Sequence, residues 1–155
     1  MELFETNWLA QVEIAIKVVI AGTFGGIVGL ERELANRPAG LRTHALLASA
    51  AALLVGLGDL LIDRFAEDTL PQVLRADPLR IVEAIVTGVA FLGAGTIFRH
   101  HESRIIEGLT TGASLLLVSA IGIAVGLGQL LLAALVTLVS LVLLRLVGRI
   151  LSKRG

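Results

Sequence analysis

Residues Gly29 to His44 read GLERELANRPAGLRTH and join two apolar runs, each long enough to cross a bilayer. The segment holds two glutamates, three arginines and one histidine. A charged segment between two apolar runs is typical of a loop that connects membrane spans. The pattern therefore indicates a polytopic membrane protein.

The composition excludes most other classes of protein. The 155 residues are 55% hydrophobic and 17% charged, with a mean hydropathy of +0.89, which is too apolar for an ordinary soluble domain. The 13 basic and 13 acidic residues cancel, so no net field favours nucleic acid. The absence of cysteine excludes disulfides and cysteine metal ligands. We expect one transmembrane domain over residues 1–155.

The apolar runs predict an all-α fold with five transmembrane helices. A helix is expected because lipid offers no hydrogen-bond partner to the backbone and the runs lack the alternation of a barrel strand. The predicted spans are Trp8–Leu30, Thr43–Leu61, Leu79–Phe98, Leu109–Leu127 and Leu130–Val147.

Basic residues in the loops predict the orientation of these spans, because Lys and Arg are enriched on the cytoplasmic side. One side receives most of them: Arg32, Arg37, Arg42, Arg99, Arg104, Arg145, Arg149, Lys153 and Arg154. The other side receives Arg64, Arg75 and Arg80. We expect the N-terminus outside and the C-terminus in the cytoplasm.

Two segments suggest an internal repeat. GLRTHALLASAAALLVGLG starts at Gly40 and GLTTGASLLLVSAIGIAVGLG starts at Gly108. Two hairpins in the same membrane orientation, followed by a fifth helix, would give this pattern. The alternative is a chance match, since small and apolar residues fill most membrane helices.

Glycines at helix-packing spacing predict tight contacts between spans, because small residues let helix backbones approach closely in lipid. Gly25 and Gly29 are four apart in the first span. Gly93 and Gly95 are expected at a crossing of the third span. In the alternative reading, such glycines leave room for an ion.

Charges inside or beside the spans are candidate functional groups. Glu13 and Lys17 are spaced for an ion pair within one helix. Glu83 can pair with Arg80 on its own helix or with Lys17. Asp77 precedes a proline and is expected to cap the third span.

Polar residues near the cytoplasmic ends of the spans predict a shared vestibule. Thr43 and either Thr110 or Thr111 are expected to cap the second and fourth spans. We expect Glu31, Arg42 and Thr110 to converge there, with Arg42 neutralising Glu31.

No catalytic constellation is present in the sequence. His44, His100 and His101 have no metal-ligand spacing, and adjacent histidines in a basic loop are expected in water. No nucleophile elbow or phosphate-binding loop occurs. We expect neither an enzyme nor a bound cofactor.

Five motifs, taken together over roughly residues 15–128, resemble the MgtC/SapB family of bacterial inner-membrane proteins. They are Gly29–Glu33, Gly40–Thr43, Asp77 with Arg80, Phe91–Gly95 and Gly108–Thr111. Ala90 replaces a usual glycine and Gly112 a usual alanine. Candidate functional residues from these motifs and from the charge pattern are Glu31, Arg32, Arg42, Thr43, Asp77, Arg80, Glu83, Gly93, Gly95, Thr110 and Thr111.

The resemblance implies a multi-pass protein of the bacterial inner membrane. The family is associated with adaptation to low magnesium, with virulence, and in some members with inhibition of the F-type ATP synthase. Many members continue into a soluble cytoplasmic domain after the fifth span, so we expect a short form here.

Two functions follow as hypotheses. The first is a non-enzymatic regulator that binds another membrane complex or self-associates in the lipid bilayer, without nucleic acid. The second is a small cation or proton transporter. The acidic residues are divided between the two membrane faces, which gives no dense cluster for a magnesium pore.

Overall fold

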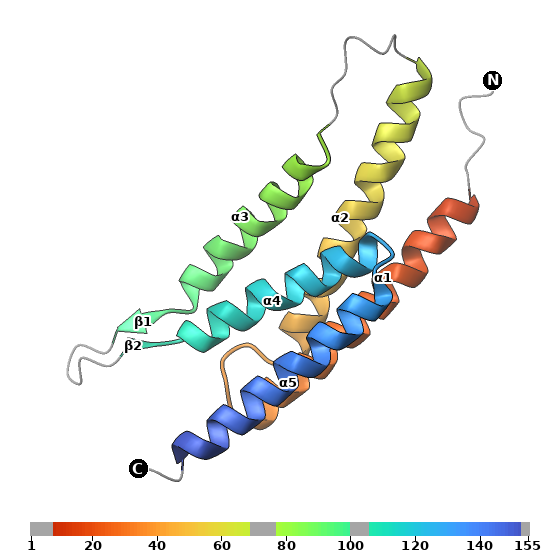
Figure 1. The fold of residues 1–155 in the computed structure, drawn as a ribbon. Coiled ribbons are helices and arrows are strands. Elements are labelled where there is room, and N and C mark those ends of the chain that lie inside the picture. The colour runs from red at the N-terminus through yellow and green to blue at the C-terminus, as the bar shows by residue number, and fades with distance from the viewer. Residues whose placement is uncertain (1–7, 69–76, 100–105, 153–155) are drawn as a thin grey trace.

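The computed structural model describes residues 8–68, 77–99 and 106–152. In these ranges the chain forms five helices and one short pair of strands (Figure 1). The elements are α1 (Trp8–Leu34), α2 (Leu41–Asp68), α3 (Leu79–Gly95), β1 (Phe98–Arg99), β2 (Ile106–Glu107), α4 (Leu109–Gly126) and α5 (Leu130–Ser152). The prediction of an all-helical fold is confirmed.

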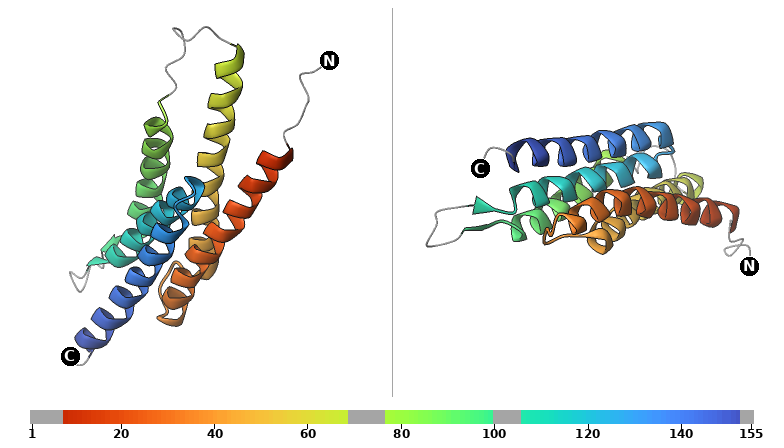
Figure 2. Two further views of the ribbon diagram at one scale, coloured as in Figure 1. Left: turned by 45° about the vertical axis from the view of Figure 1, so that its right-hand side comes forward. Right: turned by 90° about the horizontal axis from the view of Figure 1, so that it is seen from below.

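Helix α4 lies at the centre of the bundle and contacts each of the other four helices. Helix α5 packs against both α4 and α1, while α2 lies on the other side of α4 from α5 (Figure 2). Consecutive helices run back and forth, so α2 and α4 point the same way (Figure 1). This arrangement fits two hairpins and a fifth helix, although the internal repeat itself stays a prediction.

The sequence of α4 explains its central place. Its apolar residues cover the whole circumference, and a helix that is hydrophobic all round is a buried one. Leu115, Val118, Ile121 and Val125 are each at most 2% exposed. They join small residues of α1 and α2, such as Ala21 and Ala48, in the two clusters of the core.

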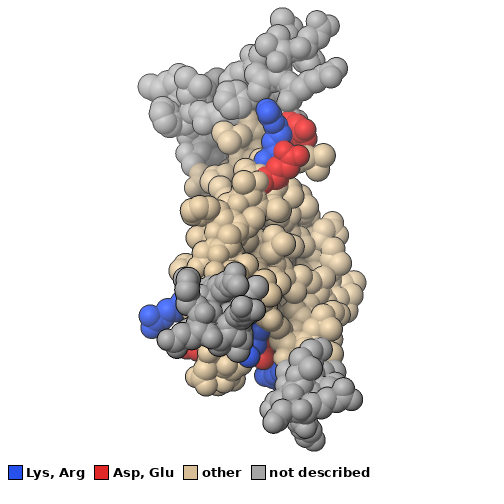
Figure 3. All heavy atoms as spheres, turned by 90° about the vertical axis from the view of Figure 1, so that its left-hand side faces the viewer, with Lys and Arg blue, Asp and Glu red and all other residues tan. Residues whose placement is uncertain are grey.

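Among the described residues, three helices are long and apolar enough to span a membrane: Trp8–Leu34, Leu41–Ile62 and Leu109–Gly126. Segment Leu130–Arg145 of α5 is apolar but shorter. Large apolar side chains such as Val19, Phe91 and Leu131 lie exposed on the outside. On the face drawn in Figure 3, charged residues gather near the two ends and leave an uncharged band between them. This surface suits a bilayer.

Glycines let α1 and α4 reach the backbone of α2 from two sides. A methyl group added at Gly25 would lie 2.5 Å from the carbonyl oxygen of His44. One added at Gly122 would collide with the carbonyl oxygen of Ala48. The predicted packing role is therefore confirmed for Gly25 and also for Gly29, where a methyl group would lie 2.7 Å from the carbonyl oxygen of Gly40.

Two glycines of the third span, Gly93 and Gly95, were expected at a helix crossing, but only Gly93 contacts α4. Gly93 faces Gly112, and a methyl group added at Gly93 would lie 3.4 Å from the Gly112 Cα. A methyl group at Gly95 would meet no atom within 4 Å. The expectation that Gly95 lies at the crossing is wrong, because two residues along a helix turn a side chain to another face.

Several predicted span ends differ from the structure. Helix α3 ends at Gly95 rather than Phe98, because Phe98 and Arg99 pair with Glu107 and Ile106 as strands. Gly108, which follows β2, has a φ of 90° and sits against the carbonyl oxygen of Thr96, so no side chain fits there. Helix α2 continues to Asp68, beyond its predicted end at Leu61.

The close approach of α4 to α2 gives a testable prediction. Gly122→Val places a side chain against the α2 backbone and should lower the free energy of unfolding by about 1–3 kcal/mol or more. Gly88→Val is the matched control, because nothing lies within 4 Å of its added methyl group. Thermal unfolding in detergent measures both variants. Equal melting temperatures would contradict the packing described here.

Candidate functional site

Two charged side chains are buried where α1 ends. Glu31 and Arg32 are 8% and 4% exposed, and their Oε2 and Nε atoms lie 3.0 Å apart. Neither of these two atoms has a hydrogen bond of good geometry. Charges are rarely buried without a partner, so each holds the other in place. Burying such a pair is costly unless its two charges stay together.

His44 lies beside this pair and is fully buried. Its Nδ1 donates to the carbonyl oxygen of Gly40 over 2.9 Å, and its Nε2 lies 3.0 Å from the Ser114 Oγ of α4. The charges of Glu31 and Arg32 both act on the imidazole ring. We call Glu31, Arg32, His44 and Ser114 the polar cluster; it ties α1, α2 and α4 together.

The hydrogen bonds of the polar cluster are compatible with both the neutral and the protonated form of His44. The Ser114 hydroxyl lies 2.8 Å from the carbonyl oxygen of Thr111 and can donate to it. A neutral His44 accepts this hydroxyl hydrogen at Nε2, whereas a charged His44 donates to Ser114 Oγ and frees the hydroxyl for Thr111. Either protonation state of His44 therefore keeps both ring nitrogens bonded.

Helix ends close to the cluster are capped differently from the prediction. Glu33 Oε2 accepts the backbone N–H of Leu41 over 2.8 Å, so Glu33 rather than Thr43 caps α2. Helix α4 follows Gly108, with no side-chain cap. The capping roles expected for Thr110 and Thr111 are wrong: Thr110 is exposed, and Thr111 is 2% exposed and offers its carbonyl to Ser114.

Arg42 does not neutralise Glu31, which is a second correction. Within the described ranges Arg32 is the partner of Glu31, and Arg42 is exposed. Arg32 follows Glu31 directly, and neighbouring helical residues point about 100° apart, which is why the sequence did not suggest this pair. The expected convergence of Glu31, Arg42 and Thr110 on one vestibule is therefore not formed.

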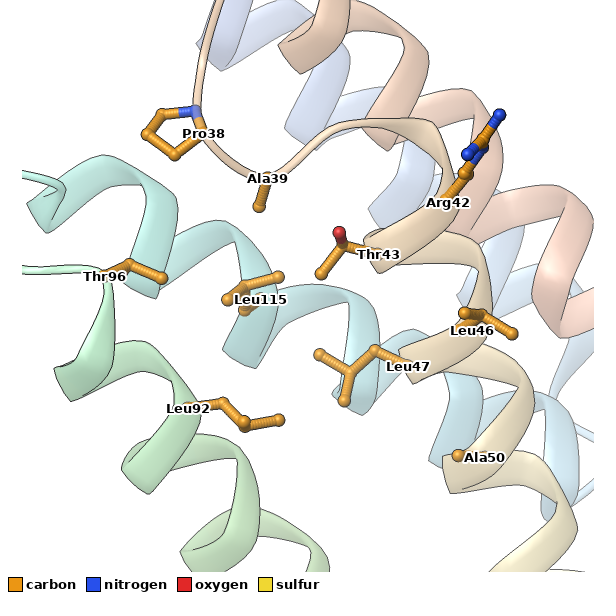
Figure 4. A pocket seen from close by; sticks show the side chains of 10 residues that line it. All are labelled: Pro38, Ala39, Arg42, Thr43, Leu46, Leu47, Ala50, Leu92, Thr96 and Leu115. Carbon is orange, nitrogen blue, oxygen red and sulfur yellow. The ribbon is translucent and has the colours of Figure 1, made fainter.

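Arg42 instead stands at the rim of a groove of about 500 Å³ (Figure 4). The groove lies between α2 and α3, and α4 forms its floor with the buried Leu115. We call it the lateral groove. Its other lining residues used below are Thr43, Leu46, Leu47 and Leu92.

The remaining candidates lie at the opposite end of the bundle, where α3 begins. Asp77 Oδ1 accepts the N–H of Leu79 over 3.0 Å, which confirms its predicted capping role. Arg80 and Glu83 are exposed, and in the described structure Glu83 forms an ion pair with neither Arg80 nor Lys17. Lys17 pairs with Glu13 over 2.7 Å, as predicted.

The structure thus unites Glu31, Arg32 and Thr111 around His44 and separates them from Asp77, Arg80 and Glu83. His44 and Ser114 were missed: His44 has no metal-ligand spacing and was given no role, and Ser114 was not among the candidates. The signal was available: His44 is one helical turn from Gly40 and directly precedes an apolar run. His100 and His101 lie outside the described residues.

Comparison with known proteins identifies the family of this chain. A model described as the MgtC family matches residues 18–153. The chain belongs to the MgtC family. Its membrane helices and its relatives make it a bacterial membrane protein.

Relatives of this MgtC-family chain come from distant bacteria. Protein SapB of Bacillus subtilis is 36% identical over 124 residues, covering 79% of this chain and 51% of its own. Protein MgtC of Brucella abortus is 38% identical over 120 residues, with 76% and 45% covered. The "Putative magnesium transporter YhiD" of Escherichia coli K12 is 36% identical over 117 residues, with 76% and 52% covered.

The chain spans about half the length of these relatives. No solved structure matches it significantly.

The buried ion pair gives a second prediction. Arg32→Ala leaves the Glu31 carboxylate buried without its partner, which typically costs about 3–5 kcal/mol of unfolding free energy. Arg37→Ala is the control, because Arg37 is exposed in the adjacent loop. Replacing Glu31 and Arg32 together by leucine should recover much of the loss. Chemical unfolding in detergent micelles measures all three, and equal stability of the two alanine variants would refute the role of the pair.

Proposed function

We propose that this protein is a non-enzymatic component of the bacterial inner membrane that serves magnesium homeostasis by binding another membrane complex. Membership of the MgtC family and the name of the Escherichia coli relative support the link to magnesium. The family resemblance identifies the F-type ATP synthase as the complex to test.

The apolar middle of the bundle is the observation that carries this proposal. The polar cluster lies at one end, and the charges of Asp77, Arg80 and Glu83 lie at the other. Between them the core is built from residues such as Ala52, Val118 and Val125. A conduction path needs polar or charged groups along its length, and such groups are costly in a membrane unless they serve a path.

Hydroxyl groups in this middle region are already used. Ser119 donates to the carbonyl oxygen of Leu116, and Thr137 donates to that of Ala133. Each bond stays within one helix, so neither of these two hydroxyls has a free hydrogen to donate across the core. Among the described residues, moreover, no three acidic or histidine side chains are grouped for a metal ion.

The outer face of α3 supports binding to a partner helix. Gly88 and Gly95 have open space beside them, and Phe91 between them is 79% exposed. Small residues beside a large apolar one allow close helix contact in lipid. We assign the docking of the partner complex to this face.

Co-reconstitution with a purified bacterial F-type ATP synthase tests the proposal. We expect the protein to lower both ATP hydrolysis and proton pumping in liposomes, because a bound regulator slows the enzyme. Gly95→Leu should lose most of this inhibition, whereas Ala15→Leu, on the exposed surface of α1, should retain it. A magnesium-sensitive dye inside the liposomes should report no flux above that of protein-free liposomes.

The same assay identifies the second candidate, a cation or proton transporter, which the name of the Escherichia coli relative favours. A transporter would dissipate the proton gradient and leave hydrolysis unchanged or faster, or would give magnesium flux. Such flux, abolished by Glu83→Gln or Glu31→Gln, would overturn the regulator proposal. Unchanged hydrolysis without any flux would exclude the ATP synthase as partner.

We further propose that the end of the bundle with the α1–α2 loop faces the cytoplasm. The enrichment of Arg and Lys in the loops of that end supports this orientation. Reporter fusions at Gly155 should therefore read cytoplasmic, and fusions at Asp68 should read external. An external reading at Gly155 would refute the five-span orientation.

A further inference from the structure

The lateral groove combines an apolar interior with a positive rim. Leu115 forms its buried floor, while Leu46 and Leu92 on its two sides are 71% and 53% exposed. These exposed leucines lie in helices that face lipid, so the groove is open sideways to the bilayer. Its volume of about 500 Å³ is within the ~300–1,000 Å³ typical of small-ligand sites.

The polar rim of the groove is suited to an anion. Arg42 and Thr43 stand in the first turn of α2, and the Arg42 guanidinium extends away from the apolar lining (Figure 4). In the part of the chain that the structure describes, the N–H groups of Arg42 and Thr43 have no acceptor. Free N–H groups and the helix dipole favour a phosphate at this position.

The charges around the mouth of the lateral groove also favour an anion there. Arg32 is neutralised by Glu31, and Glu33 is bound to the N–H of Leu41. Arg42 forms no ion pair among the described residues. Its positive charge is therefore available for a negative group placed at the mouth of the groove.

We infer that the lateral groove binds one anionic phospholipid, with an acyl chain against Leu46, Leu47, Leu92 and Leu115 and the phosphate at Arg42 and the start of α2. Basic pockets between membrane helices are known to bind anionic lipid headgroups in this way. The apolar interior requires the phosphate to carry a hydrocarbon chain, which distinguishes a lipid from free phosphate.

Fluorescence quenching by brominated lipids tests this inference. In a Trp8→Phe background, L92W places the reporter at the groove, and L131W places it on the exposed face of α5. We expect brominated phosphatidylglycerol to quench L92W with an affinity about fivefold above that of brominated phosphatidylcholine, the change that one arginine gives near an anionic lipid. L131W should show no such preference.

Charge-removing variants complete the test. R42Q should abolish the preference seen with L92W, whereas R37Q, which removes an exposed charge from the adjacent α1–α2 loop, should keep it. Inorganic phosphate should compete no better than chloride at equal ionic strength.

Three results would overturn the inference. Equal quenching of L92W by both lipids would show that the groove does not select an anionic lipid, and its occupant would then be something else, such as a partner helix. An equal loss in R37Q and R42Q would mean general surface attraction. Competition by phosphate alone would mean an anion site that needs no lipid.

Discussion

Contact between helix backbones on both sides of α2 is the constraint on which the bundle depends. Gly25 brings α1 against the carbonyl oxygen of His44, and Gly122 brings α4 against that of Ala48, one turn further along. Lipid gives no hydrophobic drive between helices, so such close contacts supply much of the association energy. They also fix the rotation of α2, which turns His44 inward to Ser114.

This rotation divides the polar residues of the α1–α2 boundary into two groups. His44 faces α4 and bonds to Ser114, while Glu31 and Arg32 pair with each other at the buried end of α1. Arg42, two positions before His44, is turned outward to the lateral groove. One short charged segment therefore serves both the interior and the lipid-facing surface, and substitutions at its arginines should have different consequences.

Periodicity and spacing predicted the five helices, the cap at Asp77, the Glu13–Lys17 pair and the packing at Gly25, because each depends on neighbours in sequence. Predictions that required helix rotation were less successful. Gly95 on α3 was placed at a crossing that Gly93 makes instead, and Thr110 on α4 was placed in a vestibule although it is exposed, because spacing alone does not give the rotation of a helix against its neighbours. Glu31 was given the wrong arginine, because adjacent helical residues rarely pair.

The central position of α4 has a consequence for how the protein is made. Helices α1 and α2 can pair as soon as both have left the ribosome, since their contacts are mutual. The face of α2 around Ala48 and Ala52, however, packs against α4, which is synthesised more than fifty residues later. His44 likewise meets Ser114 only when α4 is present. Packing of the core is therefore completed late in synthesis, and a nascent chain arrested before Leu109 would expose to membrane proteases the face of α2 that α4 covers.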